Sequence, residues 1–158
     1  MNSIALTLCL AMVACSQTEP VWAYRELRET VQVDKHVALG LRVNASVFAG
    51  GLTLAIEAKN NAQQPIAVDF AGVAVRNARG MVLRRRQERA LSIRCDSGQS
   101  EAMLSPQRSC QSTHGLINIH PRVLDRPNPD LATLTVTFSV RSPPEAAASV
   151  VRLSLERE

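Results

Sequence analysis

The stretch from residue 37 to residue 58, VALGLRVNASVFAGGLTLAIEA, decides the fold of this chain. Apolar side chains occupy every second position before and after the Ala49-Gly50-Gly51 tripeptide. A period of two is typical of a strand with one buried face and one solvated face, and the glycines supply the freedom that a tight turn needs. The stretch therefore predicts a β-hairpin. The apolar positions are Val37, Leu39, Leu41, Val43, Ala45, Val47, Leu52, Leu54, Ile56 and Ala58.

The same period of two recurs further along the chain. It predicts strands over 66–75 with a bulge at Gly72, 81–83, 91–95, 134–140 and 151–155. The interval 96–129 contains four prolines and shows no period, so we expect it to be irregular. Residues 25–28 and 146–148 have helical composition but are too short to form stable helices.

Seven or eight short strands with few helical segments predict an all-β fold, an antiparallel β-sandwich. The stretch from Leu52 to Leu83 combines a strand, a loop containing Pro65, a second strand and the turn RNARG at 76–80. It resembles the immunoglobulin-like modules of many bacterial envelope proteins, which implies an immunoglobulin-like topology. A transthyretin-like topology fits the same pattern. The Cys-Trp-Cys order of true immunoglobulin domains is missing, because Trp22 precedes the two cysteines of the body.

Composition excludes several classes of protein. The chain has 158 residues, 46% of them hydrophobic and 20% charged, with a net charge of +4, which suits one globular domain. No apolar run reaches the roughly 20 residues of a membrane-spanning helix. Only five aromatic side chains occur, so stacking platforms for bases or sugars are scarce and we expect no nucleic-acid partner.

The N-terminal segment MNSIALTLCLAMVAC carries no charge and has an apolar centre from Ile4 to Ala14. Its end, LAMVAC, resembles the lipobox of bacterial lipoproteins, in which a cysteine after a small residue is lipidated. The resemblance implies a signal peptide over 1–14, a lipidated Cys15 with a tether over 15–28, and a sandwich over 29–158. It also implies an envelope location, anchored to a membrane and facing the periplasm. Cleavage after Ala23, which gives a soluble periplasmic protein, is the alternative.

Export determines how the cysteines are interpreted. Cys9 leaves with the leader and Cys15 becomes the anchor, so Cys95 and Cys110 remain. Two thiols in one small domain of an oxidising compartment predict a structural disulfide. It closes a polar ring that holds little apolar material, and we expect it to stabilise the fold by about 3 kcal/mol.

The sequence offers few residues in patterns typical of catalysis or metal binding. No nucleophile elbow and no phosphate-binding glycine motif occurs, so we expect neither a catalytic residue nor a cofactor, and not an enzyme. His114 and His120 are the best metal ligands, with His36, Met81 and Met103 as remote candidates. Neither a strand nor a helix brings two histidines six residues apart onto one ion, and only an irregular loop could do so, so no metal site is predicted.

Arginine is concentrated in one part of the chain. Residues 76–94 hold seven arginines and one acidic residue, and the whole chain has 16 Arg against two Lys. Arg84 and Arg86 share one face of an extended strand and Arg85 the other, which predicts an edge strand or a hairpin tip. Arg84, Arg85, Arg86 and Arg89 either protect that edge from strand addition or contact an anionic partner. Phospholipid phosphates, peptidoglycan carboxylates and an acidic protein surface are the candidates.

These observations favour a binding or scaffolding lipoprotein, accessory to an envelope, secretion or pilus assembly, with the membrane and an envelope protein as partners. One alternative is an inhibitor or immunity protein that inserts the loop from Asp96 to Pro129 into an envelope-degrading enzyme. Another is a periplasmic metal carrier that uses His114, His120 and Met103.

Overall fold

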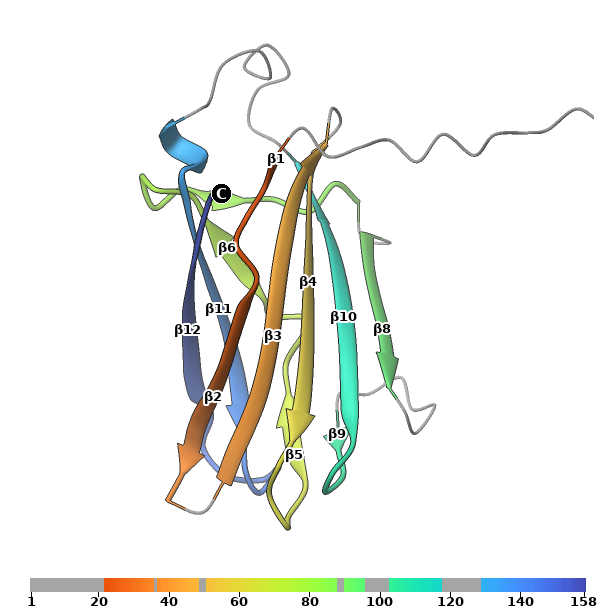
Figure 1. Cartoon of the computed structure of the whole chain (residues 1–158). Helices are drawn as coiled ribbons and strands as arrows, with labels where there is room; N and C mark the ends of the chain where they lie inside the picture. The colour runs from red at the N-terminus through yellow and green to blue at the C-terminus, as the bar shows by residue number, and fades with distance from the viewer. Residues whose placement is uncertain (1–21, 36, 49–50, 88–89, 96–102, 118–128) are drawn as a thin grey trace, which may run out of the picture.

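The computed structural model describes residues 22–35, 37–48, 51–87, 90–95, 103–117 and 129–158. The described residues form twelve strands in two antiparallel sheets that pack face to face (Figure 1). This confirms the prediction of an all-β antiparallel sandwich. Seven of these strands have five or more residues, and the others have two or three. No helix in the described ranges is long and apolar enough to span a membrane.

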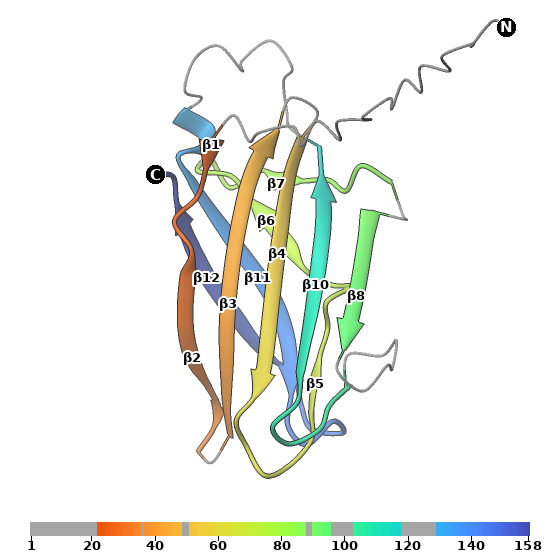
Figure 2. The same ribbon diagram turned by 45° about the vertical axis from the view of Figure 1, so that its right-hand side comes forward.

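The first sheet is built on the predicted hairpin. Its strands are β1 (Trp22–Ala23), β2 (Leu27–Asp34), β3 (Val37–Phe48), β4 (Gly51–Asn60), β8 (Leu91–Cys95) and β10 (Ser109–Leu116). The order is β1-β3-β4-β10-β8, and β2 pairs with β3 along the same edge as β1. Strand β8 therefore forms one edge of this sheet, as Figure 2 shows.

The second sheet is centred on the long strand β11. Its strands are β5 (Ile66–Val68), β6 (Ala74–Arg76), β7 (Val82–Leu83), β9 (Met103–Leu104), β11 (Thr133–Arg141) and β12 (Ser149–Glu156). Strand β12 pairs with β11 along its length, while β5 and β6 share the opposite edge of β11. Strands β9 and β7 lie outside β5 and β6, and a short 3-10 helix, Pro129–Leu131, precedes β11.

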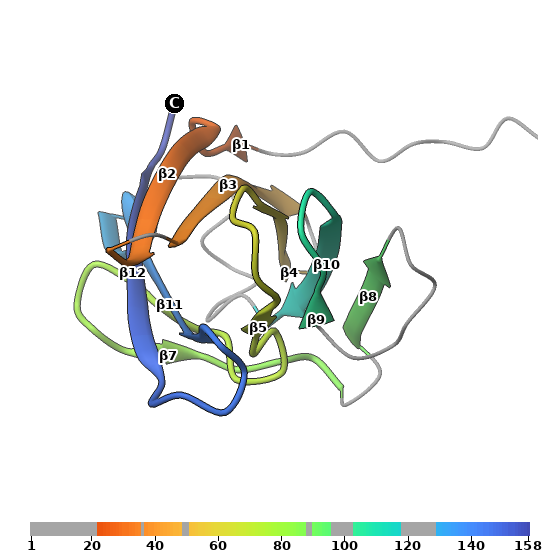
Figure 3. The same ribbon diagram turned by 90° about the horizontal axis from the view of Figure 1, so that it is seen from below.

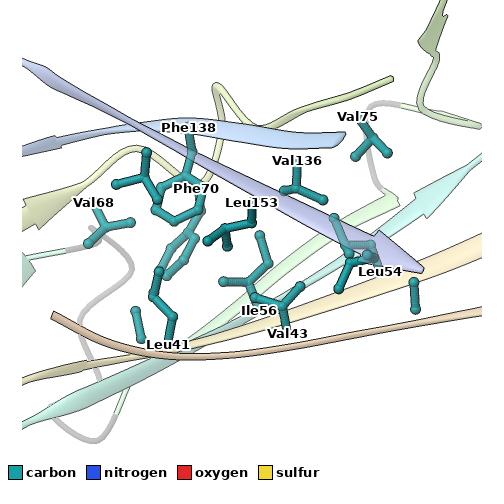
Figure 4. Close-up of a cluster of buried hydrophobic side chains, with 14 of the residues drawn as sticks. Leu41, Val43, Leu54, Ile56, Val68, Phe70, Val75, Val136, Phe138 and Leu153 are labelled. Carbon is teal, nitrogen blue, oxygen red and sulfur yellow. The ribbon is translucent and has the colours of Figure 1, made fainter. Parts of the chain in front are cut away.

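Side chains from the facing sheets fill the core. In β3 and β4 the apolar positions of the hairpin are all buried and the positions between them are more exposed. Figure 4 shows Leu41, Val43, Leu54 and Ile56 of the first sheet opposite aromatic and aliphatic side chains of the second. Those labelled side chains are Val68, Phe70, Val75, Val136, Phe138 and Leu153. Aliphatic residues thus build most of this core, as the scarcity of aromatics requires.

The described part of the sandwich already includes Trp22, so the boundary predicted at residue 29 differs from the structure. The backbone N–H of Tyr24 donates to Ala45 O at 2.9 Å, and the Tyr24 hydroxyl donates to Leu131 O at 2.5 Å. The backbone N–H of Arg25 donates to Glu156 O at 2.9 Å, which ties the first sheet to the end of β12. Figure 3 shows β2 beside β12 on this closed side. Residues 22–28 therefore belong to the fold and not to a tether, and no helix forms at 25–28.

The expectation of an irregular interval over 96–129 is wrong for residues 103–104 and 109–116, which form β9 and β10. Strand β10 was missed because three of its four buried side chains, Cys110, Ser112 and His114, are not aliphatic. The sequence of β10 therefore lacks the alternation of apolar and polar residues that is typical of a half-buried strand. The strand predicted over 66–75 is divided into β5 and β6, because Asp69 Oδ1 accepts the Gly72 N–H at 2.8 Å and closes a turn.

Asn60 links the two sheets at the end of β4. It is fully buried, and its side-chain amide donates to Gln64 O at 2.8 Å and Leu104 O at 2.9 Å. Its Oδ1 accepts the Ala62 N–H at 2.8 Å. A buried polar side chain is stable only when it is hydrogen-bonded in this way. Asn60 therefore fixes β9 and the start of the second sheet against the hairpin.

Candidate functional site

The arginine segment joins the two sheets. After β7, residues 84–86 leave the second sheet and pair with the end of β10 in the first. The N–H of Ile117 donates to Arg84 O at 2.8 Å, and the N–H of Arg86 donates to Gly115 O at 3.1 Å. Arg85 forms a single antiparallel bridge with Leu116. We call residues 84–86 the arginine crossing.

Side chains alternate along the arginine crossing as the sequence predicts. Arg84 and Arg86 are exposed, whereas Arg85 is half-buried and donates to Ala71 O. Strand β7 lies at the edge of its sheet, as predicted for this segment. Arg89 lies outside the described residues. The charged groups of Arg84 and Arg86 therefore face solvent, whereas Arg85 is hydrogen-bonded to the backbone.

The remaining described arginines of 76–94 do not form one patch with the crossing. Arg76 donates to Gly80 O at 2.9 Å, and Arg79 Nε lies 2.7 Å from an Asp130 carboxylate oxygen. Arg94 is on β8, in the first sheet. These side chains are therefore spread over both sheets, although they are close in sequence.

The exposed guanidinium groups differ in whether the protein already neutralises them. On the outer face of β2 and β3, the Nε atoms of Arg28 and Arg42 lie 2.5 and 2.8 Å from Glu26 carboxylate oxygens. Hydrogen bonds from Arg28 and Arg42 hold the pKa of Glu26 below its usual range. Within the described part of the chain, the side chains of Arg84 and Arg86 have no such carboxylate. An external anion is better suited to the arginine crossing than to the face near Glu26.

The predicted disulfide is present, and it joins two strands. Cys95 of β8 and Cys110 of β10 are directly paired residues with Cα atoms 4.0 Å apart. Their sequence separation is 15. The bond therefore fastens the edge strand to the sheet, a role that the sequence did not reveal because β10 was not predicted.

Ser112 and His114 form a buried polar pair that sequence reasoning missed. Ser112 Oγ lies 3.0 Å from His114 Nε2, and His114 Nδ1 is buried without a hydrogen-bond partner among the described residues. Burial, followed by the nearby charge of Arg85, lowers the pKa of His114 to about 4. The two residues are 0% and 1% exposed, so neither contacts solvent as a nucleophile or base must. Only the pairing of β10 with β4 and β8 reveals this burial.

The burial of His114 also bears on the candidate metal ligands. Met81 is exposed and Met103 is half-buried in β9, and neither is grouped with His114 by strand pairing. His36 and His120 lie outside the described residues. Within the described ranges, no three His, Cys, Asp or Glu side chains are close enough to hold a metal ion.

Fold and site together define a class: a two-sheet antiparallel β-sandwich with a cross-strand disulfide and an arginine segment that connects its sheets. No protein-family model matches the chain, and no curated protein matches it. Among solved structures, the chain is similar to the GAE domain of GGA2p from Saccharomyces cerevisiae, with 9% identity and a TM-score of 0.33. The match covers 81% of this chain and 94% of that one.

Proposed function

We propose that this chain is an envelope lipoprotein that is anchored to a membrane through Cys15 and binds an envelope protein partner. The lipobox-like sequence at residues 10–15 supplies the anchor, and the sandwich supplies the binding surface. Cys15 and the leader lie outside the described residues, so the sequence supports this part of the proposal. The proposed class is a binding or scaffolding module and not an enzyme.

The Cys95–Cys110 disulfide is the observation that carries this proposal. Disulfides persist in oxidising compartments such as the periplasm and are rare where thiols are kept reduced. A cross-strand bond in a small exported domain agrees with a leader that directs export. The bond and the leader are independent features, because they lie in different parts of the chain.

The position of β1 favours cleavage before Cys15 over cleavage after Ala23. Cleavage after Ala23 removes Trp22 and Ala23, which pair with Val47 and Ser46 as strand β1. Cleavage before Cys15 keeps that strand and leaves the six residues 16–21 as a tether. Seven Cα-to-Cα steps from Cys15 to Trp22 span at most about 25 Å. The anchored sandwich therefore stays close to the leaflet.

Binding through an edge strand suits the architecture. In β8, Leu91, Ile93 and Cys95 alternate with Ser92 and Arg94, and the first three are only half-buried. In the described part of the chain β8 pairs with β10 alone, so its other edge carries backbone groups able to accept a partner strand. The inhibitor alternative is less favoured, because residues 103–104 and 109–116 of the proposed inserting loop are held in the two sheets.

The anchor is tested by Cys15→Ser. We expect the variant to leave the membrane fraction and appear in the soluble periplasmic fraction, because one lipidated cysteine provides the attachment. Fractionation of cells that express either form measures this. Unchanged membrane fractionation of the variant would refute the lipoprotein assignment.

The partner is tested by placing a photo-crosslinking amino acid at Ser92 on the edge strand. We expect Ser92→benzoylphenylalanine to yield one defined adduct in intact envelopes. The matched control is Asn44→benzoylphenylalanine, on the exposed side of the interior strand β3, which should yield none. Equal adducts from both positions, or none from Ser92, would count against recognition through β8.

A further inference from the structure

We propose that the end of the sandwich from which the tether departs is a docking surface for anionic phospholipid. The inference rests on the proposed anchor and names a second contact with the same leaflet. The surface consists of the exposed arginines Arg84 and Arg86 and the exposed apolar side chain of Ile117. We call these three residues the lipid-facing patch.

The pairing register places the tether and the arginine crossing at one level of the first sheet. Trp22 pairs with Val47, Val47 with Leu52, Leu52 with Leu116, and Leu116 with Arg85. Four strand-to-strand steps of about 4.8 Å separate Trp22 from Arg85 by about 19 Å. Figures 1 and 2 show β1 and the segment following β7 at the same end of the molecule.

An exposed apolar side chain lies beside the arginine crossing. Ile117 is 44% exposed, and its backbone N–H donates to Arg84 O at 2.8 Å. Val82 and Val150 are also exposed, but they lie on the outer face of the second sheet and are not part of this surface.

The arginines and Ile117 lie on one side of the crossing. Arg85 bridges the buried Leu116 and is itself half-buried, so Arg84 and Arg86 lie on the outer face of the first sheet. The backbone hydrogen bond from Ile117 to Arg84 places Ile117 beside these residues. Apolar side chains flanked by arginines suit the interface of a bilayer, where the former enter the headgroup region and the latter bind phosphate.

The short tether makes lipid the expected occupant. A link of at most about 25 Å brings the sandwich to the leaflet whenever Cys15 is anchored there. Arg84 and Arg86 have no carboxylate partner in the described part of the chain, so their charge is available to anionic headgroups. Each basic side chain near such a surface strengthens binding about fivefold.

Quenching of Trp22 fluorescence by brominated lipid tests the docking, because Trp22 is the only tryptophan and lies at the same end. A chain beginning at Cys15 retains every described strand and is coupled through the Cys15 thiol to maleimide lipid in vesicles. We expect stronger quenching on vesicles of brominated phosphatidylglycerol than on brominated phosphatidylcholine. The phosphatidylcholine vesicles report the quenching caused by the tether alone.

Two surface variants locate the contact. The double variant Arg84→Glu with Arg86→Glu should weaken docking by at least about tenfold and reduce quenching to the phosphatidylcholine level. Ile117→Ser should weaken it on the same vesicles without changing the charge. The control is Arg152→Glu with Val150→Ser, which reverses one charge and removes one apolar side chain among the exposed residues of β12 and should leave quenching unchanged.

Equal quenching on both lipids, or equal effects of the test and control variants, would overturn the lipid assignment. A crosslinked envelope protein at the lipid-facing patch, without lipid-dependent quenching, would overturn it too. The chemical coupling supplies the tether, so these results do not depend on lipidation in the cell. Fractionation of Cys15→Ser separately tests the anchor.

Discussion

His114 is neutral in the folded protein because the core excludes the water that would solvate an imidazolium. Its Nε2 contacts Ser112 Oγ, and its Nδ1 is buried with no hydrogen-bond partner in the part of the chain that the structure describes. The Arg85 charge adds a repulsion that disfavours a second positive charge. Protonation of this ring is therefore coupled to the stability of the sandwich.

The free energy of unfolding should decrease as the pH is lowered from 6.5 to 4, because His114 titrates in this range. The pKa of His114 is about 4 in the folded chain and about 6.5 in the unfolded chain, so unfolding takes up a proton between these values. The contribution of neutral His114 is complete above pH 6.5 and is lost as the pH falls toward 4. We expect a loss of about 3 kcal/mol in the free energy of unfolding over this window.

Urea unfolding at several pH values, with and without His114→Gln, measures this effect. The variant should lose this part of the pH dependence, whatever its stability at neutral pH. Comparison of the slopes removes the effect of substitution on the core itself. An identical slope for both proteins between pH 6.5 and 4 would show that His114 is not responsible.

The edge strand β8 depends on its disulfide. Its hydrogen-bonded partner in the described chain is β10, and its inward side chains are only half-buried. Short edge strands with few buried contacts open at low free energy. The Cys95–Cys110 bond opposes this opening by covalently joining paired residues of β8 and β10.

Cys95→Ala with Cys110→Ala should lower the free energy of unfolding by about 3 kcal/mol, the loop entropy of a ring this size. Protection against hydrogen exchange should fall in β3 and β4 by the loss in global stability, and in β8 it should fall further because the edge strand opens locally. Thermal denaturation and exchange followed by mass spectrometry measure the two effects. A loss of protection in β8 no greater than that in β3 and β4 would contradict a local role for the disulfide.

The whole sandwich depends on residues that precede the boundary expected from the sequence. Tyr24 is 3% exposed, and the Arg157 guanidinium lies 5.8 Å from the Trp22 ring centroid. The N–H of Glu158 donates to Ala23 O at 3.2 Å. The first and last described residues thus close one side of the fold together.

Removal of β1 should destabilise the molecule as a unit. The free energy of unfolding of a chain beginning at Tyr24 should be about 2 kcal/mol lower than that of a chain beginning at Ser16. The shorter chain loses partly buried apolar area and the contact between Trp22 and Arg157. Urea denaturation measures the difference. A chain beginning at Val21 keeps β1 and serves as the control. Equal stability of all three chains would remove the structural argument against cleavage after Ala23.

Local patterns predicted much of the framework. The hairpin of β3 and β4, the turn at 77–80, the edge position of the arginine segment and the strand β8 follow from alternation and turn residues. The pairing of Cys95 with Cys110 followed from the number of cysteines that an exported chain is expected to retain. Such features depend on neighbouring residues or simple counting, so no knowledge of distant contacts is needed.

The sequence by itself thus determined a β-sandwich built on a long hairpin, with one disulfide and an exposed arginine segment. Tertiary structure alone decided that β10 is an interior strand, that His114 is buried and that Arg85 lies level with Trp22. The physical reason is that these features depend on pairing between segments far apart in the chain. A polar residue such as His114 lies in the core because side chains of other strands cover it. The pattern of neighbouring residues in the sequence does not indicate this burial.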